Sequence, residues 1–125
     1  MILGIGIDLV DVARIRDSLS RFGDRFLNRI LLPAEADYCR HLPDPALHVA
    51  ARFAAKEAVS KAFGTGIGPE LGWHDIEVAR QANGCPAVEF HGPGAELAKT
   101  RGVKRVFVSL SHTATTAAAS VILEG

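Results

Sequence analysis

Two carboxylates and one amine in this sequence have the types and spacing that phosphate chemistry needs. Asp8 lies inside the apolar run ILGIGIDLVDVARI, and Glu57 and Lys61 lie four residues apart in RFAAKEAVSKAFGTGIG. Carboxylates with few competing protein ligands are typical of Mg²⁺ sites completed by water and substrate phosphate. Neither stretch contains His or Cys, which argues against zinc. We therefore predict Asp8 and Glu57 as magnesium ligands, with Lys61 as the point charge that meets phosphate.

Each of these residues also has a simpler interpretation. Glu57 and Lys61 can form an exposed ion pair along a helix, which contributes only a few tenths of a kcal/mol. Asp8 can be a strand-end acid that caps the next helix. Phe53 favours the functional interpretation, because an aromatic ring one turn before Glu57 is out of place on a solvated helix face. The loop GTGIG also favours it, since its backbone N–H groups could approach phosphate oxygens without obstruction by side chains.

The elements that must position these groups follow from the periodicity of the sequence. Alternation over residues 3–9 predicts a strand with apolar side chains on one face and Gly4, Gly6 and Asp8 on the other. The run looks suited to burial, and glycine inside a strand often marks the close approach of another backbone or a ligand. The apolar face consists of Leu3, Ile5, Ile7 and Leu9.

The strongest helical pattern runs from Pro45 to Phe63, with Asp44 as N-cap and Gly64 at the stop. Placed on a helix, its small side chains gather on one side, where they would allow close packing against a sheet. The other side is predicted to carry Phe53, Lys56, Glu57, Ser60 and Lys61.

The remaining elements predict one domain spanning residues 1–125. Further helices are expected from a cap at Asp11 to Phe22 and over residues 33–41 and 94–102, and further strands over 74–81, 86–90, 105–113 and 116–124, with a hairpin turn at Asn83 and Gly84. This order indicates an α+β fold, with a mainly antiparallel sheet wrapped by one long and two or three short helices.

Composition excludes some classes of partner. Fourteen Lys and Arg balance fourteen Asp and Glu, so no overall field draws the chain to nucleic acid or an anionic membrane. No apolar stretch reaches 18 residues, so no membrane span is expected. Cys39 and Cys85 form no metal-like pair, and without a signal peptide they indicate reduced thiols in a cytoplasmic protein.

Two further features allow both structural and functional interpretations. His112, in SLSHT, is either a hydrogen-bonded structural residue or a ligand contact. Arg14 and Arg21 lie seven residues apart, on one helix face, and Arg25 follows Gly23. This arginine set is either a solvated face or a docking surface for an acidic partner.

Four motifs together resemble the bacterial holo acyl-carrier-protein synthases, which are small phosphopantetheinyl transferases. They are GIGIDLVDVARI, RFAAKEAVSKAFGTGIG, NGCP at residues 83–86 and SLSHT, and the resemblance covers nearly the whole chain. Two departures are small. Cys85 replaces the polar or basic residue common in its turn, which bears on a peripheral coenzyme contact. Leu32 stands where a threonine cap is frequent, which bears on helix stability.

The resemblance implies transfer of 4′-phosphopantetheine from coenzyme A to a serine of apo acyl carrier protein, in support of fatty acid biosynthesis. It implies Mg²⁺ on Asp8 and Glu57, Lys61 on the pyrophosphate, and either Glu57 or a water polarised by the metal as acceptor of the serine proton. It also implies a homotrimer with active sites at subunit interfaces, and docking of the acidic carrier on the arginine helix. The implied coenzyme contacts are Phe53, Ser60 and Gly64 along the channel, and Asn83, Gly84, Pro86, His112 and Thr113 around the adenosine 3′-phosphate.

Two rival functions use the same groups. A Mg²⁺-dependent phosphohydrolase would consume coenzyme A or another nucleotide with no carrier present. A coenzyme A or nucleotide sensor would hold phosphate through Lys61 and the glycine loop without turnover.

Overall fold

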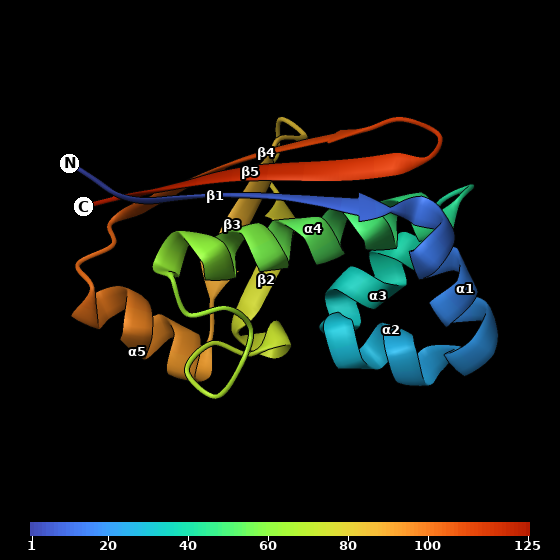
Figure 1. Cartoon of the computed structure of the whole chain (residues 1–125), viewed down its shortest axis with the longest axis horizontal. Coiled ribbons are helices and arrows are strands. Elements are labelled where there is room, and N and C mark those ends of the chain that lie inside the picture. The colour runs from blue at the N-terminus through green and yellow to red at the C-terminus, as the bar shows by residue number, and fades with distance from the viewer.

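The N-terminal apolar run forms strand β1 (Ile2–Asp11), an outer strand of a three-stranded antiparallel sheet. A computed structural model describes all residues from Met1 to Gly125. The sheet order is β1-β5-β4, with β5 (Thr116–Glu124) in the centre and β4 (Arg105–His112) on the far side. The first and last strands of the chain thus lie side by side, and both termini lie at the same end of the sheet (Figure 1).

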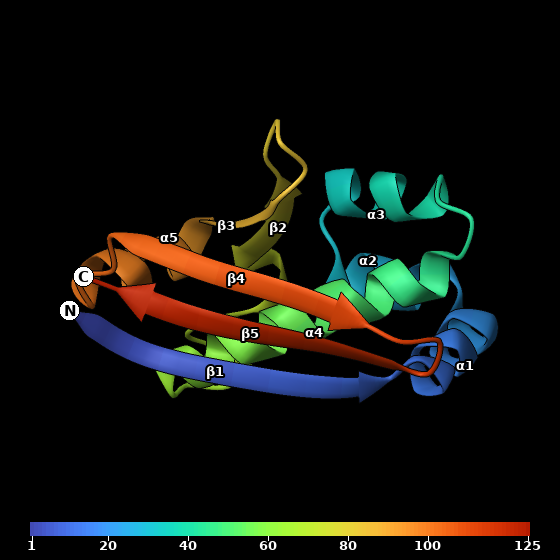
Figure 2. The ribbon, with the colours of Figure 1, turned by 90° about the horizontal axis from the view of Figure 1, so that it is seen from above.

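Helix α4 (Pro45–Phe63) packs lengthwise under this sheet, mainly against β1 and β5 (Figures 1 and 2). Its bounds agree with the predicted helix, and Gly64 ends it in the left-handed conformation. Small side chains allow the close packing, since helix residues such as Ala54, Ala55 and Ala58 are completely buried.

The face of β1 that the structure buries is the glycine face. A Cβ atom at Gly4 or Gly6 would collide with the backbone carbonyl of Ala62 or Ala58 in α4, so glycine is required where the strand crosses the helix. The apolar face of β1 points away from α4 and is exposed, which corrects the expectation of a buried run. Its exposed members are Leu3, Ile5, Ile7 and Leu9.

Four shorter helices and a second sheet complete the domain. The helices are α1 (Val12–Phe22), α2 (Asp24–Ile30), α3 (Pro33–Arg40) and α5 (Gly92–Thr100), and a 3₁₀ turn, η1, spans Trp73–Asp75. Strands β2 (Ile76–Arg80) and β3 (Pro86–Phe90) pair only with each other, so the fold has two antiparallel sheets rather than one. Helix α2 was absent from the predicted elements. The α+β class is confirmed.

Two predicted side-chain caps do not form. Asp11 and Asp44 occupy the N-cap positions of α1 and α4, but neither side chain makes a capping hydrogen bond. Asp44 instead accepts two hydrogen bonds from Arg16, at 2.9 and 3.2 Å, which tie α1 to the start of α4. At α3 the N-cap residue Leu32 has no polar side chain, and its backbone N–H instead donates to Oε1 of Glu35 in the first turn, at 2.8 Å.

The predicted polar side of α4 is divided in the folded chain. Phe53, Glu57 and Lys61 are accessible, whereas Lys56 and Ser60 are fully buried. The prediction for Lys56 and Ser60 is therefore wrong, because the short helices and η1 cover that flank of α4 (Figure 1). None of the helices combines the length and apolar character needed to cross a bilayer.

Candidate functional site

The fold brings Asp8, Glu57 and Lys61 to one cavity of about 430 Å³. Asp8 reaches it from the glycine face of β1, and Glu57 and Lys61 reach it from successive turns of α4. Helices α1 and α2 close the remaining side. The lining residues are Asp8, Leu9, Arg14, Ile15, Ser18, Phe26, Phe53, Glu57 and Lys61. Asp8 and Glu57, which are 49 positions apart in the sequence, therefore line the same cavity.

The ion pair in this cavity links Lys61 to Asp8 across the strand–helix junction. Lys61 Nζ donates to Asp8 Oδ1 at 2.8 Å and to the carbonyl of Ile7 at 3.1 Å. The Asp8 side chain is only 15% exposed, so a cation is needed close to it. The structure therefore favours neither simpler interpretation: Lys61 pairs with Asp8 rather than with Glu57, and Asp8 caps no helix.

Glu57 is the acid without an opposite charge in contact. Partial burial raises the pKa of Glu57 above its ordinary value, the negative charge of Asp8 adds to this, and Lys61 opposes it. The hydrogen bond to Asp8 raises the pKa of Lys61, so the amine stays protonated. A pair of carboxylates that offers only oxygen atoms, one of them without a salt-bridge partner, fits a hard divalent cation such as Mg²⁺.

An aromatic pair forms one wall of the cavity. Phe53 lines the hollow, and its ring packs on Trp73 of η1 with the centroids 4.9 Å apart. Trp73 does not itself line the cavity, so its ring contacts Phe53 from outside the cavity wall.

Ser60 and the glycine loop are placed differently from what the sequence predicts. Ser60 Oγ donates to the carbonyl of Glu57 at 2.7 Å, inside the protein and out of reach of any ligand in the cavity. The N–H groups of Gly64, Thr65 and Gly66 donate to the carbonyls of Ser60 and Lys61, so they close the end of α4. The prediction that this loop presents free N–H groups to phosphate is wrong for these three. Gly64 itself is exposed at the helix end.

A second cavity, of about 450 Å³, holds the predicted residues Pro86 and His112. It shares no lining residue with the first cavity. Its other polar residues are His48, Arg52, Arg80, Cys85 and Ser109. The rings of His48 and His112 meet edge to face, with the centroids 6.4 Å apart.

The second cavity has a positive lining. Burial lowers the pKa of His48, and the neighbouring charges of Arg52, His112 and Arg80 lower it further. Arg52 and Arg80 also stack on Tyr38, at 4.7 and 5.3 Å from the ring centre. The buried Nε of Arg52 has no hydrogen-bond partner. Such a surface is suited to an anion.

Sequence reasoning missed Arg52 and Arg80 as candidate site residues. Arg52 begins the motif RFAAKEAVSKAF, and a cation among small helix residues was the signal that could have indicated it. Arg80 carried no such signal, because only the fold brings strand β2 next to α4.

Asn83, Gly84 and Thr113 shape turns next to the second cavity's elements. Asn83 Oδ1 accepts from the N–H of Cys85 at 3.0 Å, and Gly84 adopts a positive φ of 86°, so this pair forms the β2–β3 turn. Thr113 Oγ1 accepts from the N–H groups of Thr115 and Thr116 and shapes the β4–β5 turn. None of the three lines either cavity.

The predicted arginine set is spread over α1 and α2. Arg14 lines the first cavity. Arg25 lines an adjoining hollow of about 410 Å³ together with Ser18, Phe22, Phe26 and Arg29. This hollow shares Ser18 and Phe26 with the first cavity. Arg21 lies 3.7 Å from Asp17 on the same helix.

Known proteins resemble this chain over its full length. Residues 4–119 match the model of the 4′-phosphopantetheinyl transferase superfamily. A holo-[acyl-carrier-protein] synthase of Koribacter versatilis is 53% identical over 124 residues, which cover 99% of both chains. The crystal structure of holo-[acyl-carrier-protein] synthase from Neisseria meningitidis superposes with a TM-score of 0.94 at 36% identity and covers 100% of both chains. That from Helicobacter pylori, in complex with coenzyme A, gives 0.86 at 35% identity over 96% of this chain and 99% of its own. The chain belongs to the 4′-phosphopantetheinyl transferase superfamily, among its holo-[acyl-carrier-protein] synthases.

Proposed function

We propose that this enzyme transfers 4′-phosphopantetheine from coenzyme A to a serine of apo acyl carrier protein, and that the transfer requires Mg²⁺. The products are holo carrier protein and adenosine 3′,5′-bisphosphate, and the activity supplies fatty acid biosynthesis. We place it in the cytoplasm, in keeping with the free thiols of Cys39 and Cys85.

One observation carries the proposal: Asp8, Glu57 and Lys61 line a single cavity with an aromatic wall. Phosphoryl transfer depends on positioning the reactants and on neutralising charge around phosphorus. Mg²⁺ held by Asp8 and Glu57 would supply that neutralisation when bound. The protonated amine of Lys61 would attract the pyrophosphate of the coenzyme, and the ring of Phe53 would limit the space open to water.

Glu57 is our candidate for the group that receives the serine proton. Its carboxylate lines the cavity beside Lys61 and Asp8 and forms no salt bridge, so it is free to accept a proton from a serine that enters the cavity, either directly or through a water. The attacking serine oxygen forms a bond to the β-phosphorus, and the bond from that phosphorus to the bisphosphate oxygen breaks.

The second cavity is proposed to hold the adenosine 3′-phosphate. His112 and Pro86 line it, and the cations of Arg52 and Arg80 complement a phosphate dianion. Asn83, Gly84 and Thr113 lie in the adjoining turns, where their role is to hold the rim of that cavity.

Assembly would join the two cavities. They share no residue within one chain, so a single coenzyme is expected to span the first cavity of one subunit and the second of its neighbour. The exposed apolar face of β1 supports association, because water-exposed patches of this kind mark protein contacts. We propose that the assembly is a homotrimer with active sites at the subunit interfaces, which is the assembly that the resemblance to the holo acyl-carrier-protein synthases implies.

The arginine-lined hollow is proposed as the docking surface of the acidic carrier. It adjoins the first cavity, so a carrier held at Arg25 and Arg14 would place its serine beside Glu57. Arg21 and Arg29 extend the positive surface along α1 and α2. Complementary charge accelerates encounter, and carrier use is expected to weaken as ionic strength rises.

The proposal is tested by intact-mass analysis of an apo carrier after incubation with the enzyme, coenzyme A and Mg²⁺. With the unsubstituted enzyme, the mass of the carrier should increase by one phosphopantetheine group, and EDTA should stop this reaction. Asp8→Asn and Glu57→Gln should each lower the rate by about a hundredfold or more, as expected when a charge-stabilising group is lost at the reacting centre.

The matched control is Asp11→Asn, which removes an exposed acid from the same strand without touching the cavity. Its rate should equal that of the unchanged chain. Consumption of coenzyme A without a carrier would support a hydrolase instead, and tight binding without any product would support a sensor. Full activity of both cavity variants would refute the metal assignment.

A further inference from the structure

A buried ion pair lies directly behind the candidate site, on the flank of α4 opposite the sheet. Lys56 Nζ and Glu35 Oε1 are 2.7 Å apart, and both side chains are essentially inaccessible. Lys56 also donates to the carbonyls of Ile30, at 2.8 Å, and Trp73, at 3.0 Å. All three protons of the amine are thus directed to oxygen atoms.

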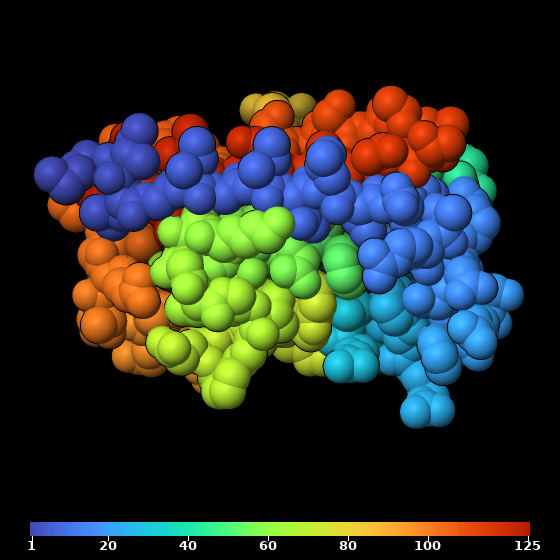
Figure 3. All heavy atoms as spheres, in the orientation of Figure 1, coloured from blue at the N-terminus to red at the C-terminus, as the bar shows by residue number.

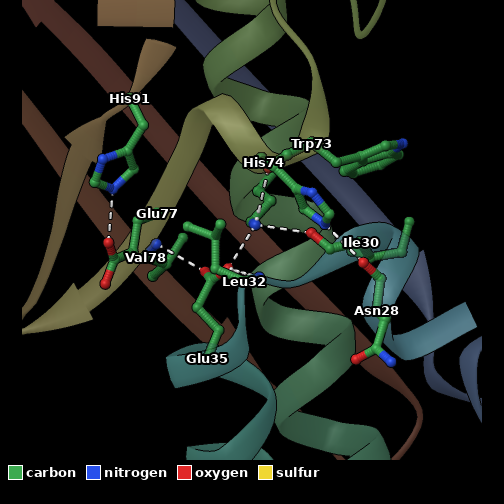
Figure 4. Close-up of polar contacts among 10 residues, drawn as sticks. Asn28, Ile30, Leu32, Glu35, Trp73, His74, Glu77, Val78 and His91 are labelled. Atoms are coloured by element: carbon green, nitrogen blue, oxygen red, sulfur yellow. Dashed lines mark hydrogen bonds and ion pairs between the residues drawn. The ribbon is translucent and has the colours of Figure 1, made fainter. Parts of the chain in front are cut away.

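Glu35 completes the network from α3. Oε1 accepts from the Leu32 N–H at 2.8 Å as well as from Lys56, and Oε2 accepts from the Val78 N–H at 2.8 Å. Figure 4 shows Glu35 between the Leu32 and Val78 backbones, with Trp73 and His74 above. His74 is itself held by the carbonyl of Asn28 at 2.6 Å. The network therefore joins the end of α2, the start of α3, α4, η1 and β2.

This network ends at the aromatic wall of the site. Lys56 holds the backbone of Trp73, and the Trp73 ring packs on Phe53, which lines the cavity with Glu57. Lys56 immediately precedes Glu57 and is one turn from Phe53 on the same helix. A fully satisfied buried network holds its members rigidly, because any movement leaves a buried polar group unpaired.

We infer that Lys56 and Glu35 are positioning residues of the transfer reaction, which fix η1 and Trp73 so that Phe53 forms a rigid wall for the coenzyme. The inference rests on the proposed function, since it assigns the wall to the coenzyme. Neither residue touches the cavity beside Glu57, so both act through Trp73 and Phe53.

The test uses Trp73, the only tryptophan in the chain, as a spectroscopic probe. Lys56→Met removes the hydrogen bond to Trp73 but leaves the Glu35 carboxylate buried and unpaired, so it can fail to fold. The double variant Lys56→Met with Glu35→Gln removes both charges and keeps the inference testable. Both variants, when folded, should show altered Trp73 emission and easier quenching by acrylamide.

The kinetic readout is the Michaelis constant for coenzyme A. It should rise severalfold in the double variant, with a smaller change in kcat, because Lys61 and Glu57 stay in place. Leu123→Ala is the matched control: it opens a buried site in β5, on the sheet side of α4, and lowers stability without altering the Trp73 emission of the folded protein.

Unchanged Trp73 emission and an unchanged Michaelis constant in a folded double variant would overturn the inference. An emission change equal to that of Leu123→Ala would also overturn it, since it would reflect lost stability alone. The emission measurement needs no reaction, so it is independent of the proposed function. If the unchanged chain fails to modify a carrier, the proposed function fails, whereas the emission result still decides whether the network holds Trp73.

Discussion

At the level of single residues, the position of Asp8 is explained by charge. Its carboxylate lies on the buried face of β1 and is matched by Lys61 at 2.8 Å. The cavity is lined by two acids and by the cations of Lys61 and Arg14, and Glu57 is the acid that forms no salt bridge. A divalent cation between Glu57 and Asp8 would relieve the repulsion between the two carboxylates, which is the physical basis of the proposed metal site.

The raised pKa of Glu57 predicts how stability depends on pH without metal. A carboxyl group whose folded pKa is raised stabilises the fold below its unfolded pKa, and this contribution is lost as pH rises through the folded pKa. Glu57→Gln cannot ionise, so in EDTA it should match the unchanged chain near pH 4 and exceed its stability above the raised pKa. Thermal unfolding from pH 4 to 8 measures this difference.

When Mg²⁺ is added in the same experiment, the unchanged chain should become more stable than Glu57→Gln. Mg²⁺ needs the ionised carboxylate, so it stabilises the unchanged chain and its apparent affinity increases with pH, while Glu57→Gln gains little. Glu70→Gln, at an exposed position outside the cavity, is the control and should follow the unchanged chain. A stability difference that is the same at every pH would contradict the assignment.

At the level of elements, sequence patterns predicted where helices and strands begin and end better than they predicted which of their faces are buried. The predicted helix 45–63 and strands 86–90 and 116–124 agree with α4, β3 and β5, because period and capping residues are local signals. The alternation of apolar and small residues in β1 identifies its two faces but does not indicate which of them is buried. That depends on the carbonyls of α4, more than fifty residues away.

The same limit applies to the site. Asp8, Glu57 and Lys61 could be grouped from their chemistry and from the resemblance, and they do share a cavity. Lys56 looked like a surface residue, because its partner Glu35 lies 21 positions earlier and only the fold brings them together. The GTGIG loop looked open to phosphate, because composition does not reveal that its N–H groups already cap α4.

The contact between β1 and α4 makes Gly6 the critical position of the two elements. Gly6→Ala should lower the free energy of unfolding by about 1–3 kcal/mol, because the added methyl group must push the strand away from Ala58. Movement of the strand also displaces Asp8 from Lys61, so activity should fall along with stability. Urea unfolding and carrier modification measure the two effects.

Gly68→Ala is the matched control for Gly6→Ala. A Cβ at Gly68 meets no atom within 4 Å, so its stability should stay within about 0.5 kcal/mol of the unchanged chain. Equal stability of the Gly6 and Gly68 variants would show that β1 and α4 are packed more loosely than described.

At the level of the whole molecule, the sheet has one face on α4 and one face without cover. On the uncovered face Ile5 pairs across the strands with Ile122, which in turn pairs with Phe107. The residues Ile5 and Phe107 are 69% and 48% exposed in the single chain. Side chains of β1 stand along the edge of the molecule in Figure 3. An apolar row of this length is costly in water, and it is the surface on which the proposed assembly depends.

Ile5→Glu should therefore convert the proposed trimer into monomers, which native mass spectrometry and light scattering would detect. Phe22→Glu, which charges another exposed apolar residue on α1, should leave the assembly unchanged. The Ile5→Glu monomer should still bind Mg²⁺, because Asp8 and Glu57 come from one chain. Its Michaelis constant for coenzyme A should rise, since the first and second cavities would no longer be joined by a neighbouring subunit.

A monomeric unchanged chain, or an Ile5→Glu variant that remains trimeric, would refute assembly through this face. Unaltered coenzyme use by the monomer would show that one chain binds the whole coenzyme alone.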